Sequence, residues 1–283
     1  MASATRTRRP KMTDEERAAY NAEQRAKLSS ITDGVYTVLH TPDVWRAMLV
    51  LTARLDLSRV AAGQPEDRSP VNVLAILGQL PTATDVRGAS DWRKVGRYPA
   101  KGSTSLRVWG PVKGRRRAEE TAGTQAQAAA EASAAPEATT DRVRVRAYAA
   151  SPTFDVSQTD GDDYTPEARP AVDPMACARR LAAALAAPVT FEDTWTGPGA
   201  LRVMLDAHAA ARFQGLETVA GQNAAEAASA AHLAALILGF DPRMAPAPQL
   251  GGMVTGARMT PAIKDSAVRV IETGRALAAL ATG

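Results

Sequence analysis

Residues 118–141 contain no aliphatic side chain larger than alanine, and they separate two segments in which apolar and basic residues alternate. The first segment, 105–110, reads Ser-Leu-Arg-Val-Trp-Gly, and the second, 142–149, reads Arg-Val-Arg-Val-Arg-Ala-Tyr-Ala. Such alternation predicts strands with one apolar and one cationic face. A stretch with so little to bury cannot order itself. We therefore expect residues 116–141 to be a disordered insertion in a β-hairpin rather than a boundary between domains.

Helix signals surround this predicted hairpin. Thr13 and Glu16 form a capping box, which predicts a first helix after a flexible basic arm at residues 1–12. Thr41, followed by proline, predicts the start of a second helix, and a third is expected to stop before Pro81. The sequence thus predicts an α+β fold, with N-terminal helices packed on a small antiparallel sheet. A mainly helical part follows, with segments near residues 174–187, 199–214, 223–239 and 260–281.

Length and composition predict two domains. At 283 residues the chain is long enough for two cores, although aromatic residues make up only 5% of it. We expect domains at 13–165 and 166–283, each with a small core lined by alanine. The single cysteine, Cys177, cannot form an internal disulfide and excludes a cysteine-based metal cluster within one chain. No stretch resembles a membrane span or a signal peptide, so we expect a cytoplasmic protein with no membrane partner.

The region between Arg87 and Arg117 carries ten basic residues against one acid, Asp91, although the net charge of the whole chain is only +4. Two tryptophans stand among these charges, and stacking surfaces interleaved with cations are typical of proteins that hold single-stranded nucleic acid. A charge run can equally be a solvated surface, and Trp92 can equally be a core residue. The candidate DNA-binding residues, which include arginines of the second predicted strand, are Arg87, Trp92, Arg93, Lys94, Arg97, Tyr98, Lys101, Arg107, Trp109, Arg144 and Arg146.

An acidic stretch follows the basic region. Between Asp155 and Asp173 there are six acids and one basic residue, Arg169. Two interpretations remain open for this stretch. It is either a mobile loop that competes with DNA for the basic face or a solvated linker between the domains.

Short blocks that share one order along the first half read Ser69-Pro-Val-Asn72-Val-Leu-Ala-Ile-Leu-Gly-Gln79-Leu-Pro81-Thr-Ala-Thr84, Trp92-Arg-Lys-Val-Gly96-Arg97, Lys101-Gly102, Pro111-Val112 and Phe154-Asp-Val-Ser-Gln-Thr159. In order and spacing these blocks resemble the N-terminal domain of ArdC-type antirestriction proteins. The resemblance covers roughly residues 28–165. It implies a domain that binds single-stranded DNA without strong sequence preference, in a phage or plasmid protein that protects incoming DNA from host restriction.

Pieces of a second pattern follow in the other half, and they read Ala225-Glu226-Ala-Ala-Ser229-Ala-Ala-His232, Leu238-Gly-Phe-Asp241 and a final helix from Ala267 to Leu280. They resemble the zincin-like domain of the same family. A zinc peptidase needs H-E-x-x-H on one helix, with two His ligands and a glutamate that takes a proton from the metal-bound water. The only candidate helix, 205–212, reads Leu-Asp-Ala-His-Ala-Ala-Ala-Arg, so one His and the Glu are missing. We therefore expect a degenerate metallopeptidase-like domain with no cofactor, no catalytic metal and no enzymatic activity.

Other functions remain as alternatives. The first is a zinc-dependent hydrolase with non-standard ligands, using His208, Glu226 and His232, which predicts stoichiometric metal. The second is an interaction protein of a mobile element that binds a host defence factor. A DNA mimic is disfavoured, because such a surface is strongly acidic and this chain carries net positive charge.

Overall fold

The computed structural model describes residues 13–61, 68–113, 145–165, 171–185, 189–216, 222–240 and 259–283, and it confirms the α+β fold. The predicted arm at 1–12 and the whole of the predicted insertion at 116–141 lie outside the described residues. No helix in these ranges is long and apolar enough to cross a membrane.

In chain order the elements are α1 (Asp14–Val38), α2 (Pro42–Ala61), α3 (Pro70–Gln79), β1 (Val86–Arg87), α4 (Ala89–Lys94), β2 (Arg97–Pro99), β3 (Leu106–Lys113), β4 (Val145–Asp155), a 3-10 helix (Val156–Gln158), β5 (Thr159–Gly161), α5 (Pro174–Ala183), α6 (Gly197–Phe213), α7 (Gln222–Ile237) and α8 (Met259–Thr282).

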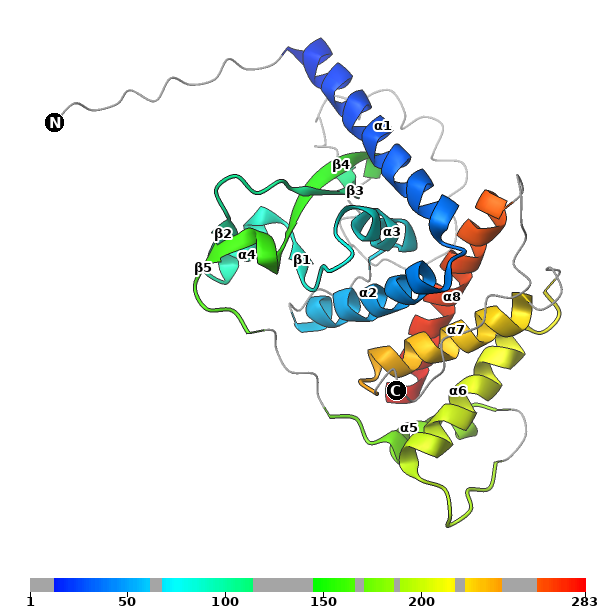
Figure 1. Ribbon diagram of the computed structural model, residues 1–283. Coiled ribbons are helices and arrows are strands. Elements are labelled where there is room, and N and C mark those ends of the chain that lie inside the picture. The colour runs from blue at the N-terminus through cyan, green and yellow to red at the C-terminus, as the bar shows by residue number, and fades with distance from the viewer. Residues whose placement is uncertain are drawn as a thin grey trace, which may run out of the picture.

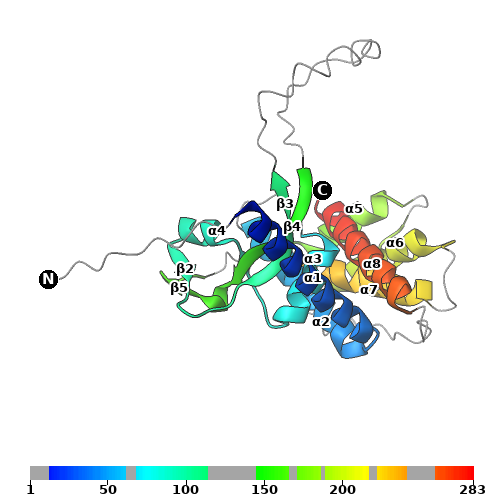
Figure 2. The same cartoon turned by 90° about the horizontal axis from the view of Figure 1, so that it is seen from above.

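The strands and the α5–α8 helices lie at opposite ends of the molecule. Figure 1 shows β1–β5 and α4 on one side, α5–α8 on the other, and α1–α3 between them. Figure 2, turned by 90°, shows the same order. The helices α1–α3 are therefore the part that joins the sheet to the C-terminal helices.

The helix starts follow from the capping signals, as predicted. The Thr13 hydroxyl accepts the N–H of Glu16, and the Glu16 carboxylate accepts the N–H of Thr13, so both halves of the capping box are made. Helix α2 begins directly after Thr41, and α3 ends before Pro81. The helical segments expected in the second half are also confirmed, as α5, α6, α7 and α8.

The alternating segments pair as an antiparallel hairpin, as predicted, and β1 adds to the far end of β4 in the order β1-β4-β3. Strand β4 runs to Asp155, well beyond the predicted end at Ala149. The predicted strand covered only the alternating segment, which ends at Ala149, and Pro152 lies in the part that was left out. Pro152 is tolerated because its partner, Arg107, directs its backbone N–H and C=O away from β4, so the N–H that proline lacks is not needed by β3.

Two side-chain amides of α3 take the place of a neighbouring strand along the free edge of β3. Gln79 accepts the backbone N–H of Arg107 and donates to its carbonyl, at 2.8 Å each. Asn72 makes the same pair of bonds with Trp109, at 2.7 and 2.9 Å. Edge strands otherwise present unpaired backbone groups. The Asn and Gln of the first family-like block therefore fix β3 against α3.

A second small sheet lies at the end of the hairpin where β3 begins and β4 ends. Strands β2 and β5 pair antiparallel, with Tyr98 opposite Asp160. The 3-10 helix that joins β4 to β5 is capped by Asp155, whose carboxylate accepts the N–H of Ser157, while Gln158 accepts the N–H of Asp155. The Phe154–Thr159 block thus shapes the turn that places the small sheet beside the hairpin.

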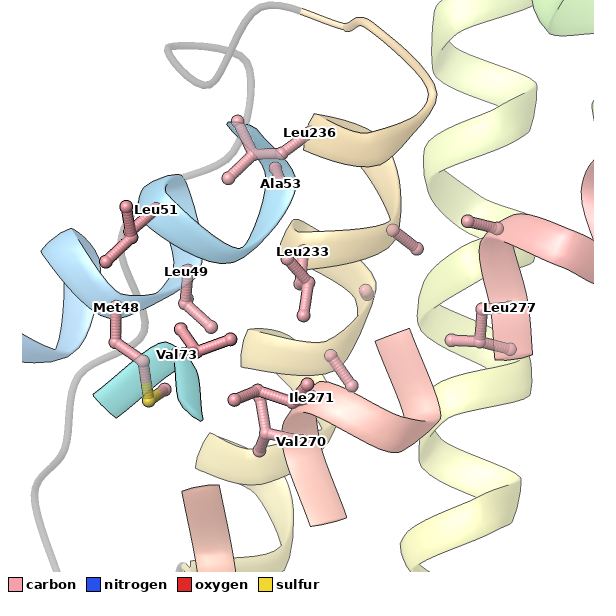
Figure 3. Close-up of a cluster of buried hydrophobic side chains, with 14 of the residues drawn as sticks. Met48, Leu49, Leu51, Ala53, Val73, Leu233, Leu236, Val270, Ile271 and Leu277 are labelled. Carbon is pink, nitrogen blue, oxygen red and sulfur yellow. The ribbon is translucent and has the colours of Figure 1, made fainter. Parts of the chain in front are cut away.

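The described residues of both halves contribute to one hydrophobic core, so the expectation of two separate cores is wrong. Figure 3 shows side chains of α2 and α3, such as Leu49 and Val73, pointing toward Leu233 of α7 and Ile271 of α8. The physical reason lies in contacts between helices that are far apart in the chain. Packing the alanine-rich helices of both halves together buries more apolar area than two separate cores would.

Buried polar contacts join the same two halves. Arg275 of α8 makes a two-point ion pair with Asp56 of α2, at 2.6 and 2.8 Å, and donates to the carbonyl of Arg68. The indole N–H of Trp45 in α2 donates to Ser229 of α7 at 3.0 Å. Each of these groups is costly to bury without a partner, so they fix how α2 meets α7 and α8.

Candidate nucleic-acid interface

One face of the β3–β4 hairpin carries the basic and aromatic side chains expected of a DNA-binding surface. Successive side chains of a strand point to opposite faces. In β3, Leu106 and Val108 are buried. Arg107 and Trp109 alternate with them and therefore lie on the opposite, partly exposed face. We call this the outer face.

Strand β4 adds an aromatic side chain to the outer face. Directly paired residues of antiparallel strands share a face, and Tyr148 lies opposite Pro111. Its side chain is 60% exposed. The residues opposite Trp109 and Arg107 are Ala150 and Pro152, which are too small to cover the tryptophan ring. The outer face thus consists of Arg107, Trp109, Pro111, Tyr148, Ala150 and Pro152.

Tyr148 was not among the candidate residues. The alternation that placed Arg142, Arg144 and Arg146 on one face places residue 148 with them, because all four positions have the same parity. The sequence interpretation selected only the cations of this strand. The shared parity of these positions was sufficient to identify Tyr148 as an aromatic residue on the same face as the cations.

Arg107 is partly exposed on the outer face. Its guanidinium Nη2 is 3.5 Å from the hydroxyl of Tyr20 in α1, and both side chains are at the surface. Among the described residues no carboxylate pairs with Arg107. Because no described carboxylate neutralises this guanidinium, it is available to pair with an anionic ligand.

Trp92 belongs to the core and is removed from the site. Its side chain is 0% exposed, its indole N–H donates to the carbonyl of Phe154 at 2.8 Å, and its ring meets that of Tyr164 edge to face. No face of the ring is open to a base. The second of the two interpretations of Trp92, a core residue that holds the loop, is therefore the one that agrees with its burial.

Arg87 is also buried and leaves the candidate site. Its guanidinium makes a two-point ion pair with Asp85, at 2.6 and 2.9 Å, and lies 5.0 and 5.3 Å from the ring centroids of Trp92 and Tyr164. Tyr164 donates its hydroxyl to Asp85, and burial together with this bond raises the pKa of Tyr164 to about 12. The sequence showed only a basic residue. Tyr164 lies far along the chain, and the fold decides that Arg87 and Asp85 are buried together, so no local pattern reveals these contacts.

Arg97 is bonded within the protein. Its guanidinium donates to the hydroxyl and the carbonyl of Thr159 and to the carbonyl of Asp162, at distances of 2.5–2.9 Å. These bonds tie β2 to β5 and to the residue that follows β5. We therefore assign Arg97 to holding the small sheet together, and its contact with a phosphate stays a prediction.

The other candidates around the small sheet are exposed. Lys94 pairs with Asp91 at 2.7 Å on the surface, which reduces the charge it offers. Tyr98 is 55% exposed, and Arg93 and Lys101 are also at the surface. These residues are accessible to a ligand, but their electrostatic surroundings differ from those of the outer face.

Aspartates from the acidic stretch lie against this small sheet. Asp160 is directly opposite Tyr98, and the N–H of Asp162 donates to the carbonyl of Gly96. Asp160, Asp162 and Asp163 are all exposed. The count of ten basic residues to one acid was a count along the sequence, and the fold brings these acids against the segment that contains Gly96 and Tyr98. The described part of the stretch is bound to the small sheet, which neither sequence interpretation had anticipated.

Two candidates fall where little is described. Arg144 lies outside the described residues, and for Arg146 only the backbone position in β4 is described. Their proposed contacts with DNA stay predictions.

Glu226 in the second half is held in a closed polar cluster. Arg269 donates to both of its carboxylate oxygens, at 2.6 and 2.9 Å, and Ser266 and Gln222 donate to one of them. Burial by itself would raise the pKa of Glu226, but the bonds from Arg269, Ser266 and Gln222 outweigh it and lower that pKa. The carboxylate is therefore ionised and fully engaged with protein groups.

The histidines of the alternative zinc site are buried in separate surroundings. His208 Nε2 lies 2.7 Å from the carbonyl of Leu181. Burial, and then the charges of Arg202 and Arg46, lower the pKa of His232, so its ring is neutral. Within the described ranges, no group of three or more His, Cys, Asp or Glu side chains is arranged to hold a metal ion.

Comparison with family models, with curated proteins and with solved structures gives no match to this chain.

Proposed function

We propose that the protein binds single-stranded DNA, without strong sequence preference, on the outer face of the β3–β4 hairpin. The observation that supports this proposal is the register of the hairpin. It gathers Arg107, Trp109 and Tyr148 on one partly exposed face, where Ala150 lies opposite Trp109 and Pro111 lies opposite Tyr148.

Each part of this face suits one part of a single strand. Unpaired bases present flat π-faces, and stacking of a base on an aromatic side chain tolerates every base. Trp109 and Tyr148 supply such rings, and Arg107 supplies a cation for the phosphates between them. The contacts available are stacking and charge, neither of which reads base edges, so we infer little sequence preference.

The resemblance to ArdC-type proteins suggests the biological setting. We infer a role in antirestriction or DNA protection for a phage or plasmid, in the cytoplasm of a bacterial host. Asn72 and Gln79, which carry part of that resemblance, hold the backbone of β3 at Arg107 and Trp109. The block that contains Asn72 and Gln79 therefore fixes the backbone of the strand that carries the proposed site. Binding to a host defence protein stays an alternative that no contact favours.

Zinc-dependent hydrolysis is the less favoured function. It requires Glu226 to bind the metal or accept a proton, but this carboxylate is already paired with Arg269. His208 is likewise in contact with the carbonyl of Leu181. A metal ligand set built from these residues would have to break both arrangements.

Replacing Arg107 by glutamine tests the phosphate contact. We expect the wild-type protein to bind a labelled oligothymidine with an affinity that falls as salt rises, and R107Q to bind more weakly with a shallower salt dependence. One lost phosphate contact changes the slope of log K against log salt by about 0.7 for single strands. Fluorescence anisotropy at several salt concentrations measures both quantities.

Arg179, an exposed arginine on α5, supplies the matched control. Helix α5 lies at the opposite end of the molecule from the hairpin (Figure 1). R179Q removes the same charge and is expected to retain the wild-type slope. If R107Q and R179Q change binding equally, the outer face does not hold the phosphates.

A further inference from the structure

Asp160, Asp162 and Asp163 form a row of exposed carboxylates, which we call the acidic strip. The strip follows β4 through the 3-10 helix and includes one residue of β5. In the sequence it looked like part of a loop or linker. Its contacts show that it is a fixed feature of the small sheet.

Bonds on both sides hold the strip in place. Arg97 donates to the carbonyl of Asp162, and Tyr164, directly after the strip, donates to the buried carboxylate of Asp85. Gly96 allows the close approach. Its φ is +70°, and a Cβ atom there would lie 2.0 Å from the Asp162 carboxylate. The Asp162 side chain therefore rests directly on the turn between α4 and β2.

The strip lies at one end of the outer face. Arg107 and Pro152 are the outer-face residues nearest the start of β3 and the end of β4. At that end Gln158 donates to the carbonyl of Thr104 and accepts, through its own carbonyl, the N–H of Ala100. These bonds bring β5 and its acids next to the chain that leads into β3. A single strand of DNA that runs along the outer face and past Arg107 therefore meets the small sheet next.

We propose that the acidic strip ends the DNA path at this point, so that phosphates are held on the outer face and excluded from the small sheet. This inference rests on the proposed function and identifies residues that set the length of the site. Like charges repel, and at physiological salt the repulsion acts over about 8 Å. The strip thus limits the extent of the DNA-binding surface, which the count of basic residues along the sequence did not reveal.

The triple variant D160N/D162N/D163N tests the inference. Asparagine keeps the size of each side chain, and the backbone bonds to Arg97 and Gly96 do not depend on the carboxylates. We expect single-stranded DNA to bind about tenfold more tightly at low salt, on the scale of three exposed ionic contacts. The salt dependence should become steeper, and longer oligonucleotides should gain more than short ones because the path is extended.

The matched control is E192Q/D193N/E272Q, which removes three exposed acids from the C-terminal part. A gain confined to the strip variant supports the inference. An equal gain in both variants, or none in the strip variant, overturns it while leaving the proposed function intact. Absence of binding by the wild-type protein and by every variant overturns the proposed function and this inference together.

Discussion

Trp92→Ala is expected to lower the free energy of unfolding by about 3–5 kcal/mol, the usual cost of removing a large buried aromatic side chain. The ring is fully buried, its N–H bonds to the carbonyl of Phe154, and it lies against Arg87 and Tyr164. Truncation leaves a cavity and removes the ring on which the buried guanidinium rests. Urea denaturation followed by circular dichroism measures the change.

Trp109→Ala is the matched control for this experiment. Trp109 is only partly buried, and its bonds to Asn72 are made by the backbone, so they survive truncation. We expect a loss of less than about 1 kcal/mol, as for most surface substitutions. A Trp92 variant as stable as the wild-type protein, with weakened DNA binding, would return Trp92 to the site.

Arg275→Met is expected to be as destabilising as Trp92→Ala, by about 3–5 kcal/mol, because it removes a two-point ion pair from a buried carboxylate. Asp56 is 4% exposed and receives two hydrogen bonds from Arg275, which joins α8 to α2. The pair connects the N-terminal and C-terminal halves. Loss of this contact should therefore lower the stability of the whole chain and not of one half.

The double variant D56L/R275M separates the charge from the packing. Apolar side chains in place of both partners leave no unpaired charge, so we expect the double variant to recover part of the lost stability. Both variants should still unfold in one transition, because the halves share one core. Two separate transitions, of which R275M shifts only one, would contradict the shared core.

Local features of the fold were predictable because local residues cause them. The Thr13 capping box, the proline after Thr41 and the alternation around Arg107 and Trp109 each specify a helix start or a strand without help from distant residues. Strand β4 was predicted too short, because the prediction covered only the alternating segment, and the tolerance of Pro152 beyond it depends on Gln79, which occupies the backbone of the paired residue.

The shared core was not predictable from composition. Length and hydrophobic fraction permit either one core or two. The choice is made by contacts such as Trp45 with Ser229, between residues far apart in the chain. A sequence pattern shows that Trp45 lies on an apolar helix face, but not which helix covers it.

The candidate site was partly predictable for the same reason. Arg107 and Trp109 were identified because alternation assigns them to a face. Arg87 was misassigned because a basic side chain looks the same in the sequence whether it meets a phosphate or a buried partner, and the bonds of Arg97 to Thr159 were hidden for the same reason. The acids opposite Tyr98 come from a different strand, so no count along one segment reveals them.

The affinity of Trp109→Ala and Tyr148→Ala for a labelled oligothymidine, compared with that of Tyr98→Ala, tests the central claim most directly. Tyr98 and Tyr148 are matched in exposure, at 55% and 60%, but Tyr98 lies beside the acidic strip and Tyr148 on the outer face. Stacking of one base is worth about 1–3 kcal/mol, so we expect W109A and Y148A each to weaken binding by roughly 5- to 150-fold, and Y98A to change it little. Undiminished binding by W109A and Y148A would contradict the assignment of the outer face as the DNA-binding surface.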